Sequence, residues 1–374
     1  MGPLKGFKII ELAGIGPGPM AAMLLADMGA TVLRVERLKP AALGVQRPLN
    51  CDITLRSRKA IALDLKSEFG VKKVLQLVEK SDALIEGFRP GVTERLGLGP
   101  KDCFAKNPKL VYGRMTGFGQ EGPMAQAAGH DLNYIAMSGA LSAIGRSGQK
   151  PTPPLNLVGD YGGGALYLVV GVLAALLETH KSGKGQVVDA AMVDGAASLM
   201  AAPFGMFAAG LLTKNRGANV LDSGAYFYDS YECRDGKFVS VAAIEGKFHS
   251  EMFRLMELDV TEVKDQMDRE DWPRLKEMME IKFKTKNRDD WIALMGGSDA
   301  CFAPVLEMDE VADDPHNFER KTFIKIDGVT QPAPAPRFSR TPNPKPTAPV
   351  KADMVKLEDA LQGWLTPEEI NSWQ

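Results

Sequence analysis

The segment Phe7-Lys-Ile-Ile-Glu-Leu-Ala-Gly-Ile-Gly-Pro-Gly-Pro-Met20 decides the fold. Its first six residues are typical of a buried strand, and the glycines and prolines after them predict a tight turn into a helix over 20–28. A second strand is expected at 31–35. Strand, helix and strand form a βαβ unit, in which parallel strands need a crossover helix and ligands usually lie at the carboxyl ends of the strands.

The same alternation continues along the chain and predicts an open α/β sheet. Further strands are expected at 60–63, 83–86, 110–115 and 186–191, with helices at 68–79 and 163–180. Residues 194–212, rich in Ala and Met, predict a helix that leaves this sheet. A hairpin around Arg234-Asp-Gly236 begins a second unit, and the prolines of 331–346 exclude helix and central strand there.

The length of 374 residues exceeds that of one ordinary domain. We expect residues 1–195 to form a large Rossmann-like domain with a parallel sheet, and 196–223 a helical linker. A smaller α+β domain is expected over 224–330. Residues 331–374 are expected to form a proline-rich return strap and a C-terminal segment that joins the large domain.

The composition excludes several classes of protein and partner. Apolar residues make up 45% and charged residues 25% of the chain, as in ordinary globular proteins. A net charge of -2 without a long basic run argues against nucleic acid as a partner. The longest apolar run, 165–177, is shorter than the ~20 residues of a spanning helix, so we expect a core helix and no membrane insertion. Separated cysteines and the lack of a recognisable signal predict a cytoplasmic protein.

The glycine turn has two interpretations. Gly14-Ile-Gly16 after a strand, with Glu36 ending the next strand, imitates a dinucleotide-binding fingerprint. The third glycine of that pattern would fall at Pro19, and Pro17 removes an amide that could face a pyrophosphate. We therefore favour a tight turn in which proline starts the helix. Among the cations, Arg37 directly follows a strand at the ligand-binding edge, where its guanidinium could stack on an adenine.

His130 lies among small residues in Ala127-Ala-Gly-His-Asp-Leu-Asn-Tyr134, where a helix should begin. A histidine in this position can be a satisfied structural residue. It can also be a base matched to physiological pH, with a ring that reaches a cleft. Its neighbour Asp131 is expected to cap the helix.

Asp160 precedes three glycines, in Val158-Gly-Asp-Tyr-Gly-Gly-Gly164. It can be a plain helix N-cap, but the glycines suggest that something large approaches the backbone, and apolar surroundings would raise the pKa of its carboxyl. Glu245 follows an expected strand of the second unit and could orient or charge-tune His130. Because we find neither a metal-binding motif nor a nucleophile elbow, the residues favour metal-free proton transfer beside an activated carbonyl.

Eight blocks of the sequence resemble the α-methylacyl-CoA racemases of the family III CoA-transferase superfamily. They occur in the same order and extend over nearly the whole chain. The blocks are Glu11-Leu-Ala-Gly-Ile-Gly-Pro-Gly-Pro19, Leu63-Asp-Leu-Lys66, Arg89-Pro-Gly-Val-Thr-Glu-Arg-Leu-Gly97, Gly117-Phe-Gly-Gln120, Gly129-His-Asp-Leu-Asn-Tyr134, Pro154-Leu-Asn-Leu-Val-Gly-Asp160, Gly183-Lys-Gly-Gln186 and Pro334-Ala-Pro-Arg-Phe-Ser339.

The resemblance implies an enzyme of fatty-acid metabolism that interconverts (2R)- and (2S)-2-methylacyl-CoA thioesters through an enolate. His130 and Asp160 would stand on opposite sides of the α-carbon, with Glu245 as partner of His130 and helix-start amides facing the enolate. No separate cofactor is expected, because CoA is part of the substrate. The residues that the resemblance assigns to CoA binding are Arg37, Ala62, Leu63, Asp64, Leu65, Lys66, Gly87, Arg95, Gly129, Asp131, Leu132, Asn133 and Tyr134.

The resemblance also implies an interlocked homodimer, in which each active site lies between the large domain of one subunit and the small domain of the other. The alternative activity is that of a CoA-transferase, where the residue matching Asp160 carries the acyl group as an anhydride. Transferases of the superfamily lack a histidine at the position of His130 and have a Gly-rich loop near that of Glu245. A non-enzymatic acyl-CoA sensor on the same fold is a third possibility.

Overall fold

The computed structural model describes residues 2–39 and 44–373. Contacts between residues divide the chain into two compact units. The first unit comprises residues 1–138, 155–199 and 318–374, and the second comprises 139–154 and 200–317. The four expected domain ranges stay a prediction.

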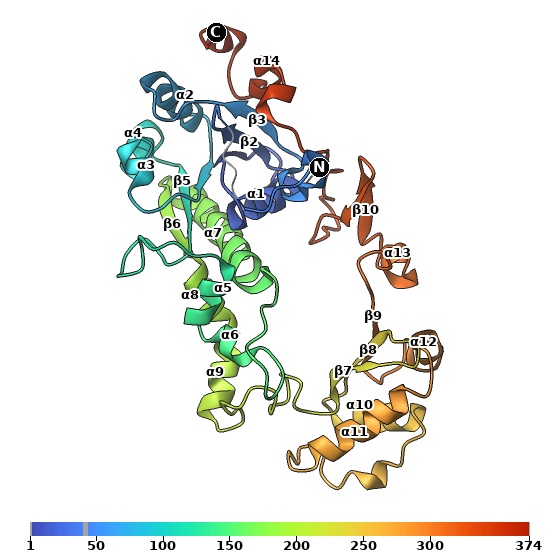
Figure 1. Ribbon diagram of the computed structural model, residues 1–374. Helices are drawn as coiled ribbons and strands as arrows, with labels where there is room; N and C mark the ends of the chain where they lie inside the picture. Colours follow the sequence, from blue (N-terminus) through green and yellow to red (C-terminus); the bar gives the residue numbers. More distant parts are fainter. Residues whose placement is uncertain (1, 40–43, 374) are drawn as a thin grey trace. The chain divides into compact units, whose positions relative to one another are not determined.

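A six-stranded parallel sheet forms the centre of the first unit (Figure 1). The strand order is β3-β2-β1-β4-β5-β6, which confirms the expected Rossmann-like α/β fold. The order reverses between β1 and β4, and ligands of open α/β sheets bind beyond the carboxyl ends of the strands at such a point. The strands are β1 (Lys8–Leu12), β2 (Thr31–Glu36), β3 (Lys59–Ala62), β4 (Ala83–Glu86), β5 (Val111–Thr116) and β6 (Gln186–Ala191).

Helices cover both faces of this sheet, because successive side chains of a strand point to opposite faces. Ile9 of β1 packs in one core cluster with α1 and α7, whereas Ile10 and Leu12 pack in another with α2 and the C-terminal helices. The helices of the first cluster are α1 (Pro17–Asp27) and α7 (Leu166–Ser182). Those of the second are α2 (Glu68–Val78), α4 (Pro100–Lys106), α14 (Leu357–Leu361) and α15 (Pro367–Asn371).

Helix α7 continues a π-helical segment, η3 (Leu157–Ala165), so the helical run is longer than the sequence predicted. Residues Leu157–Ser182 are long and apolar enough to cross a membrane by length and composition, which corrects the expectation of a run too short to do so. One side of α7, with Leu168 and Val172, is buried against the sheet and confirms the expected core helix.

The return strap is held in the first unit by Arg56, which also forms a buried ion pair. Arg56 binds Asp27 of α1, with 3.2 Å between Nε and Oδ1, and also donates to Gln331 and the carbonyl of Pro332 at 3.0 and 2.7 Å. The side chains of Arg56 and Asp27 are 2% and 1% exposed. Two strands that the sequence analysis did not predict, β10 (Phe323–Ile326) and β11 (Val329–Pro332), form the hairpin that leads into the strap.

The second unit contains a three-stranded antiparallel sheet packed on helices. Strands β7 (Tyr228–Glu232) and β8 (Phe238–Ala242) confirm the predicted hairpin, and β9 (Phe302–Val305) was not predicted.

The remaining helices belong to both units. The expected helix over 194–212 is in fact two, α8 (Met192–Leu199) in the first unit and α9 (Ala201–Ala208) in the second. The other α-helices are α3 (Val92–Arg95), α5 (Asp131–Met137), α6 (Ala140–Ala143), α10 (Gly246–Leu255), α11 (Trp272–Phe283), α12 (Arg288–Met295) and α13 (Pro315–Arg320).

Removing one partner of the buried pair should destabilise the protein strongly. Asp27→Ala leaves the Arg56 guanidinium buried without its carboxylate, and we expect a loss of about 3–5 kcal/mol in the free energy of unfolding, measured in urea. The exposed pair of Arg254 and Glu251 provides the control, and Glu251→Ala should leave the urea midpoint unchanged. Equal midpoints for Asp27→Ala and the wild type would contradict this prediction.

Candidate active site

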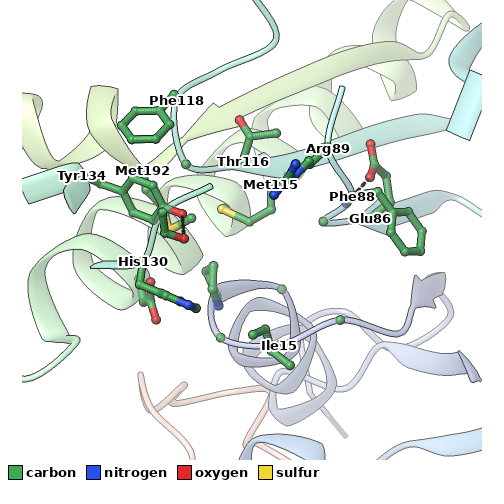
Figure 2. Close-up of a pocket in the computed structure, with 18 of the residues that line it drawn as sticks. Ile15, Glu86, Phe88, Arg89, Met115, Thr116, Phe118, His130, Tyr134 and Met192 are labelled. Atoms are coloured by element: carbon green, nitrogen blue, oxygen red, sulfur yellow. Dashed lines mark hydrogen bonds between the residues drawn. The ribbon is translucent and has the colours of Figure 1, made fainter. Parts of the chain in front are cut away.

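The loops after β1, β4 and β5 enclose a cleft of about 400 Å³, at the point where the strand order of the sheet reverses (Figure 2). Its walls come from residues 11–19, 85–90 and 115–118, together with parts of 125–134. Asp160 and Met192 complete the lining. All of these residues belong to the first unit, so the cleft is formed within one compact part of the chain.

The glycine turn after β1 forms one wall of the cleft. Gly16 has a φ of 67°, and Pro17 begins α1, which confirms the tight turn with proline at the helix start. A Cβ atom at Gly16 would lie 3.2 Å from Oδ2 of Asp160. The turn therefore approaches Asp160 closely because position 16 carries no side chain.

His130 is held at the N-cap position of α5 by backbone hydrogen bonds. Its N–H donates to Oδ1 of Asn133 at 3.1 Å, and its carbonyl accepts the N–H of Asn133 at 2.8 Å. His130 is exposed, and Figure 2 shows its ring pointing into the cleft towards the turn that carries Ile15. The backbone of His130 is thus fixed while its ring faces the cleft (Figure 2), an arrangement suited to a side chain that acts on a ligand.

Asp160 lies inside the π-helical segment η3, whose N-cap is Asn156, so the alternative interpretation of Asp160 as a helix N-cap is wrong. The Asn156 amide donates to Oδ2 of Asp160 at 3.1 Å. Burial raises the pKa of the Asp160 carboxyl, and the charge of Asp131 adds to this, against the lowering by Asn156 and His130. The result is a carboxyl that holds its proton to higher pH than an exposed aspartate does.

Asp131 does not cap α5, contrary to expectation. It occupies the first helical position, after the N-cap His130, and its carboxylate turns to the neighbouring segment. Oδ1 of Asp131 accepts the backbone N–H of Asp160 at 2.7 Å. The two residues that sequence analysis singled out for acid and base chemistry are thus joined through Asp131.

Tyr134 packs the His130 segment against the loop after β5. Its hydroxyl donates to the carbonyl of Gly129, and its ring meets Phe118 edge to face with centroids 4.9 Å apart. A Cβ atom at Gly117 would lie 2.1 Å from the Tyr134 ring. This contact explains why the loop needs glycine there, since any side chain would displace the ring.

Glu86 lines the cleft and was missed by the sequence analysis. Its buried carboxylate accepts the N–H of Phe88 at 2.7 Å and the Nε–H of Arg114 at 3.1 Å. Arg114 also binds Glu94 of α3, so Glu86 connects β4 to the segment that follows it. Burial raises the pKa of Glu86 to about 7 despite the nearby guanidinium. A charged residue that ends an otherwise apolar strand, Ala83-Leu-Ile-Glu86, is the signal that could have found it.

Comparisons with known proteins agree with this architecture. The model of CoA-transferase family III matches residues 4–352. The chain belongs to CoA-transferase family III. It is 43% identical to the α-methylacyl-CoA racemase of Mus musculus and 42% identical to that of Homo sapiens, each over 91% of this chain and 87% of the relative. It is also similar to the succinyl-CoA:glutarate CoA-transferase of Homo sapiens, at 28% identity over 90% of this chain and 81% of that enzyme.

Solved structures of the family share the fold. A CAIB/BAIF family protein from Brucella suis superposes with a TM-score of 0.80 at 26% identity, over 99% of both chains. The protein Rv3272 from M. tuberculosis superposes with a TM-score of 0.77 at 26% identity, over 94% of this chain and 96% of that one. Similarity over nearly the full length of both chains indicates that the family architecture extends through the whole chain.

Three of the CoA-binding residues that the family resemblance implies line the cleft, and Arg37 contacts a lining residue. Gly87, Gly129 and Tyr134 line it directly. The guanidinium of Arg37 lies 5.8 Å from the ring centroid of Phe88, which also lines the cleft. The other expected CoA-binding residues, Ala62, Leu63, Asp64, Leu65, Lys66, Arg95, Asp131, Leu132 and Asn133, lie outside the lining.

Glu245 lies in the second unit, at the N-cap position of α10. Its expected partnership with His130 stays a prediction, as do the contacts of the expected CoA-binding residues with CoA. Within the cleft, the structure brings His130 and Tyr134 of the α5 segment together with Asp160 of η3.

The raised pKa of Glu86 predicts a loss of stability with rising pH. Its pKa of about 7 in the folded state exceeds the ordinary value of 4.5, so the folded protein holds this proton more tightly. The free energy of unfolding should therefore fall as the pH rises from about 4.5 to about 7. Glu86→Gln removes this titration, and urea unfolding should show the variant gaining on the wild type between pH 5 and pH 8.

The exposed Glu178 of α7 provides the control for this comparison. Glu178→Gln should stay at a constant offset from the wild type over the same pH range. If the offset of Glu86→Gln were equally constant, Glu86 would not titrate in this interval.

Proposed function

We propose that this protein is a racemase that interconverts (2R)- and (2S)-2-methylacyl-CoA thioesters by 1,1-proton transfer. The observation that carries the proposal is the presence of His130 and Asp160 in one cleft at the switch point of the sheet. His130 acts on the pKa of Asp160, which indicates that the two groups are close enough to interact electrostatically. The racemases of mouse and human, at 43% and 42% identity, support the same activity.

The two groups perform opposite halves of the reaction. In one direction, the neutral imidazole of His130 takes the proton from C2, and the C–H electrons pass into the thioester carbonyl to give an enolate. The carboxyl of Asp160 then donates its proton to the other face of C2. The raised pKa of Asp160 suits this step, since the carboxyl holds its proton more tightly than that of an exposed aspartate. In the reverse direction, the ionised carboxylate is the base and the imidazolium is the acid.

We also propose that the reaction needs no separate cofactor. The thioester carbonyl itself delocalises the charge of the carbanion, and CoA enters as part of the substrate. Arg37 beside Phe88, and Arg89 in the cleft wall, offer a cationic and aromatic surface for CoA. The same proposal includes contacts with CoA by residues 62–66, which begin at the end of β3, and by Arg95 at the end of α3.

The CoA-transferase alternative uses Asp160 differently. As a nucleophile, Asp160 would have to be ionised to attack the thioester, and the racemase uses the same ionised form in one of its two directions, so the ionisation of Asp160 does not separate the two activities. His130 in the same cleft supplies the second proton carrier that a racemase needs. The presence of this second proton carrier favours racemisation.

Hydrogen exchange at C2 tests the proposed activity. Incubation with (2R)-2-methylacyl-CoA in deuterated water, with no acceptor acid, should incorporate deuterium at C2 and end in a mixture of both epimers. Mass spectrometry and chiral chromatography measure the two products. Transfer of CoA to an added carboxylate, without deuterium at C2, would establish the transferase instead.

Single substitutions assign the two proton carriers. His130→Ala and Asp160→Ala should each lower the racemisation rate by about 10²- to 10⁴-fold and leave CoA binding nearly unchanged. His316→Ala, an exposed histidine of α13, is the matched control and should keep wild-type turnover. Normal turnover by either cleft variant would remove that residue from the mechanism.

We propose that two copies of the chain associate through α7 and form the interlocked homodimer that the family resemblance implies. Leu166, Val170 and Leu177 are exposed on the side of α7 opposite the sheet, and they recur at helical spacing. Tyr167, Leu199 and Val187 add further exposed apolar surface in the same unit. Because the other side of α7 packs into the core, a second copy is a better cover for this surface than a membrane.

Charge placed on this stripe should separate the copies. Val170→Asp and Leu177→Asp are expected to change the solution mass from two chains to one, as measured by light scattering after size exclusion. Met308→Asp alters another exposed apolar residue, in the second unit, and should leave the dimer intact. A wild-type protein that runs as a monomer, or that partitions into lipid vesicles, would contradict the proposed dimer.

We propose the cytoplasm as the compartment of this protein. Cys51, Cys103, Cys233 and Cys301 are all free, which supports a reducing environment. A parallel sheet covered by helices on both faces is an architecture of soluble α/β proteins.

A further inference from the structure

The carboxylate of Asp131 is buried, and its burial needs a physical explanation. Asp131 is 5% exposed, and it lies directly after His130 in the chain. A carboxylate in this position is costly to bury unless it is hydrogen-bonded. Its Oδ1 accepts the N–H of Asp160, while its Oδ2 meets no donor in residues 2–39 and 44–373. Within the described residues, the buried carboxylate of Asp131 thus accepts one hydrogen bond, from the backbone N–H of Asp160, the second proposed proton carrier.

The contact depends on a glycine of the η3 segment. A Cβ atom at Gly159 would lie 2.6 Å from Oδ1 of Asp131 and 2.9 Å from its Cγ. Any other residue at 159 would push the carboxylate out of its place. The carboxylate of Asp131 occupies the space that a side chain at position 159 would fill, which allows α5 and η3 to approach each other closely.

Asp131 also acts on Asp160 through its charge. Its negative charge raises the pKa of the Asp160 carboxyl, after the larger effect of burial. The other groups that face Asp160 are His130 and Tyr134 of α5 and the amide of Asn156. Of these, His130 and Asn156 lower the pKa of Asp160, so Asp131 opposes them.

We propose that Asp131 is a positioning residue for proton transfer, which holds the backbone of Asp160 at a fixed place relative to His130. The proposal rests on the proposed racemase function and deepens it. It differs from the role that the family resemblance implies for Asp131, which is contact with CoA. A CoA contact would act on substrate binding, whereas a positioning residue acts on the turnover step.

Two substitutions separate the hydrogen bond from the charge. Asp131→Asn keeps an oxygen that can accept the N–H of Asp160 and removes the charge, and Asp131→Ala removes both. For Asp131→Asn we expect the limb of the pH–rate profile that reports Asp160 to move to lower pH, because a raising influence on its pKa is gone. For Asp131→Ala we expect kcat to fall about 100-fold, since a small misplacement of a reacting group is costly, with KM nearly unchanged.

Asp189→Asn is the matched control. Asp189 also accepts a backbone N–H, that of Gln120 at 3.3 Å, and burial raises the pKa of its carboxyl, but it lies outside the cleft lining. This variant should keep the wild-type kcat and pH profile. Circular dichroism of each variant at the assay temperature confirms that it is folded, and the near-isosteric Asp131→Asn carries the test if Asp131→Ala unfolds.

Exchange of deuterium into C2 by the wild type separates the two proposals. If the wild type exchanges but both Asp131 variants keep its kcat and pH profile, the positioning role is wrong and the racemase function stands. A rise in KM with unchanged kcat would assign Asp131 to CoA binding and overturn the positioning role. Absence of exchange in the wild type would overturn the racemase function and the positioning role with it.

Discussion

The parallel pairing of β1 with β2 on one side and β4 on the other is the constraint on which the rest of the structure depends. Each strand enters the sheet in the same direction, so every loop that follows a strand emerges at the same edge. Because the strand order reverses between β1 and β4, the loops after these strands diverge and leave a cleft between them. Segments that are far apart in the chain, such as 11–19 and 125–134, meet there as a consequence.

Glycine and burial then set the properties of the carboxyl groups in this cleft. Gly117 and Gly159 each allow another group to come within distances that a Cβ atom would forbid, and Gly16 allows Asp160 an approach that would be tight for a Cβ atom. The close approach excludes solvent from Asp160, and loss of solvent is the main reason that the pKa of its carboxyl is raised. The same physical effect acts on Glu86 at the end of β4. At this edge of the sheet, close packing therefore also raises the pKa of the buried carboxyl groups.

The fold was largely predictable from local sequence pattern. Strands that are buried on both faces appear as short apolar runs, and the βα turn is marked by glycine and proline, so β1 to β6 were placed within a few residues. Strands β9, β10 and β11 lack such runs, since they are half exposed and owe their structure to pairing with a neighbour. The start of the η3 segment was missed for a related reason, because its glycines disfavour helix and the packing of α5, α8 and α1 around it supplies the stability.

The sequence by itself determined the family and the parallel sheet, and it predicted His130 and Asp160 as proton carriers, since each of these rests on contiguous motifs. Only the tertiary structure decided what the neighbours of these residues do. Asp131 was expected to cap its own helix, and instead it binds the backbone of Asp160, while Glu86 proved to be part of the cleft. The physical reason is that a local motif fixes the backbone of a few residues, whereas a buried carboxylate takes the best donor that the folded chain brings to it.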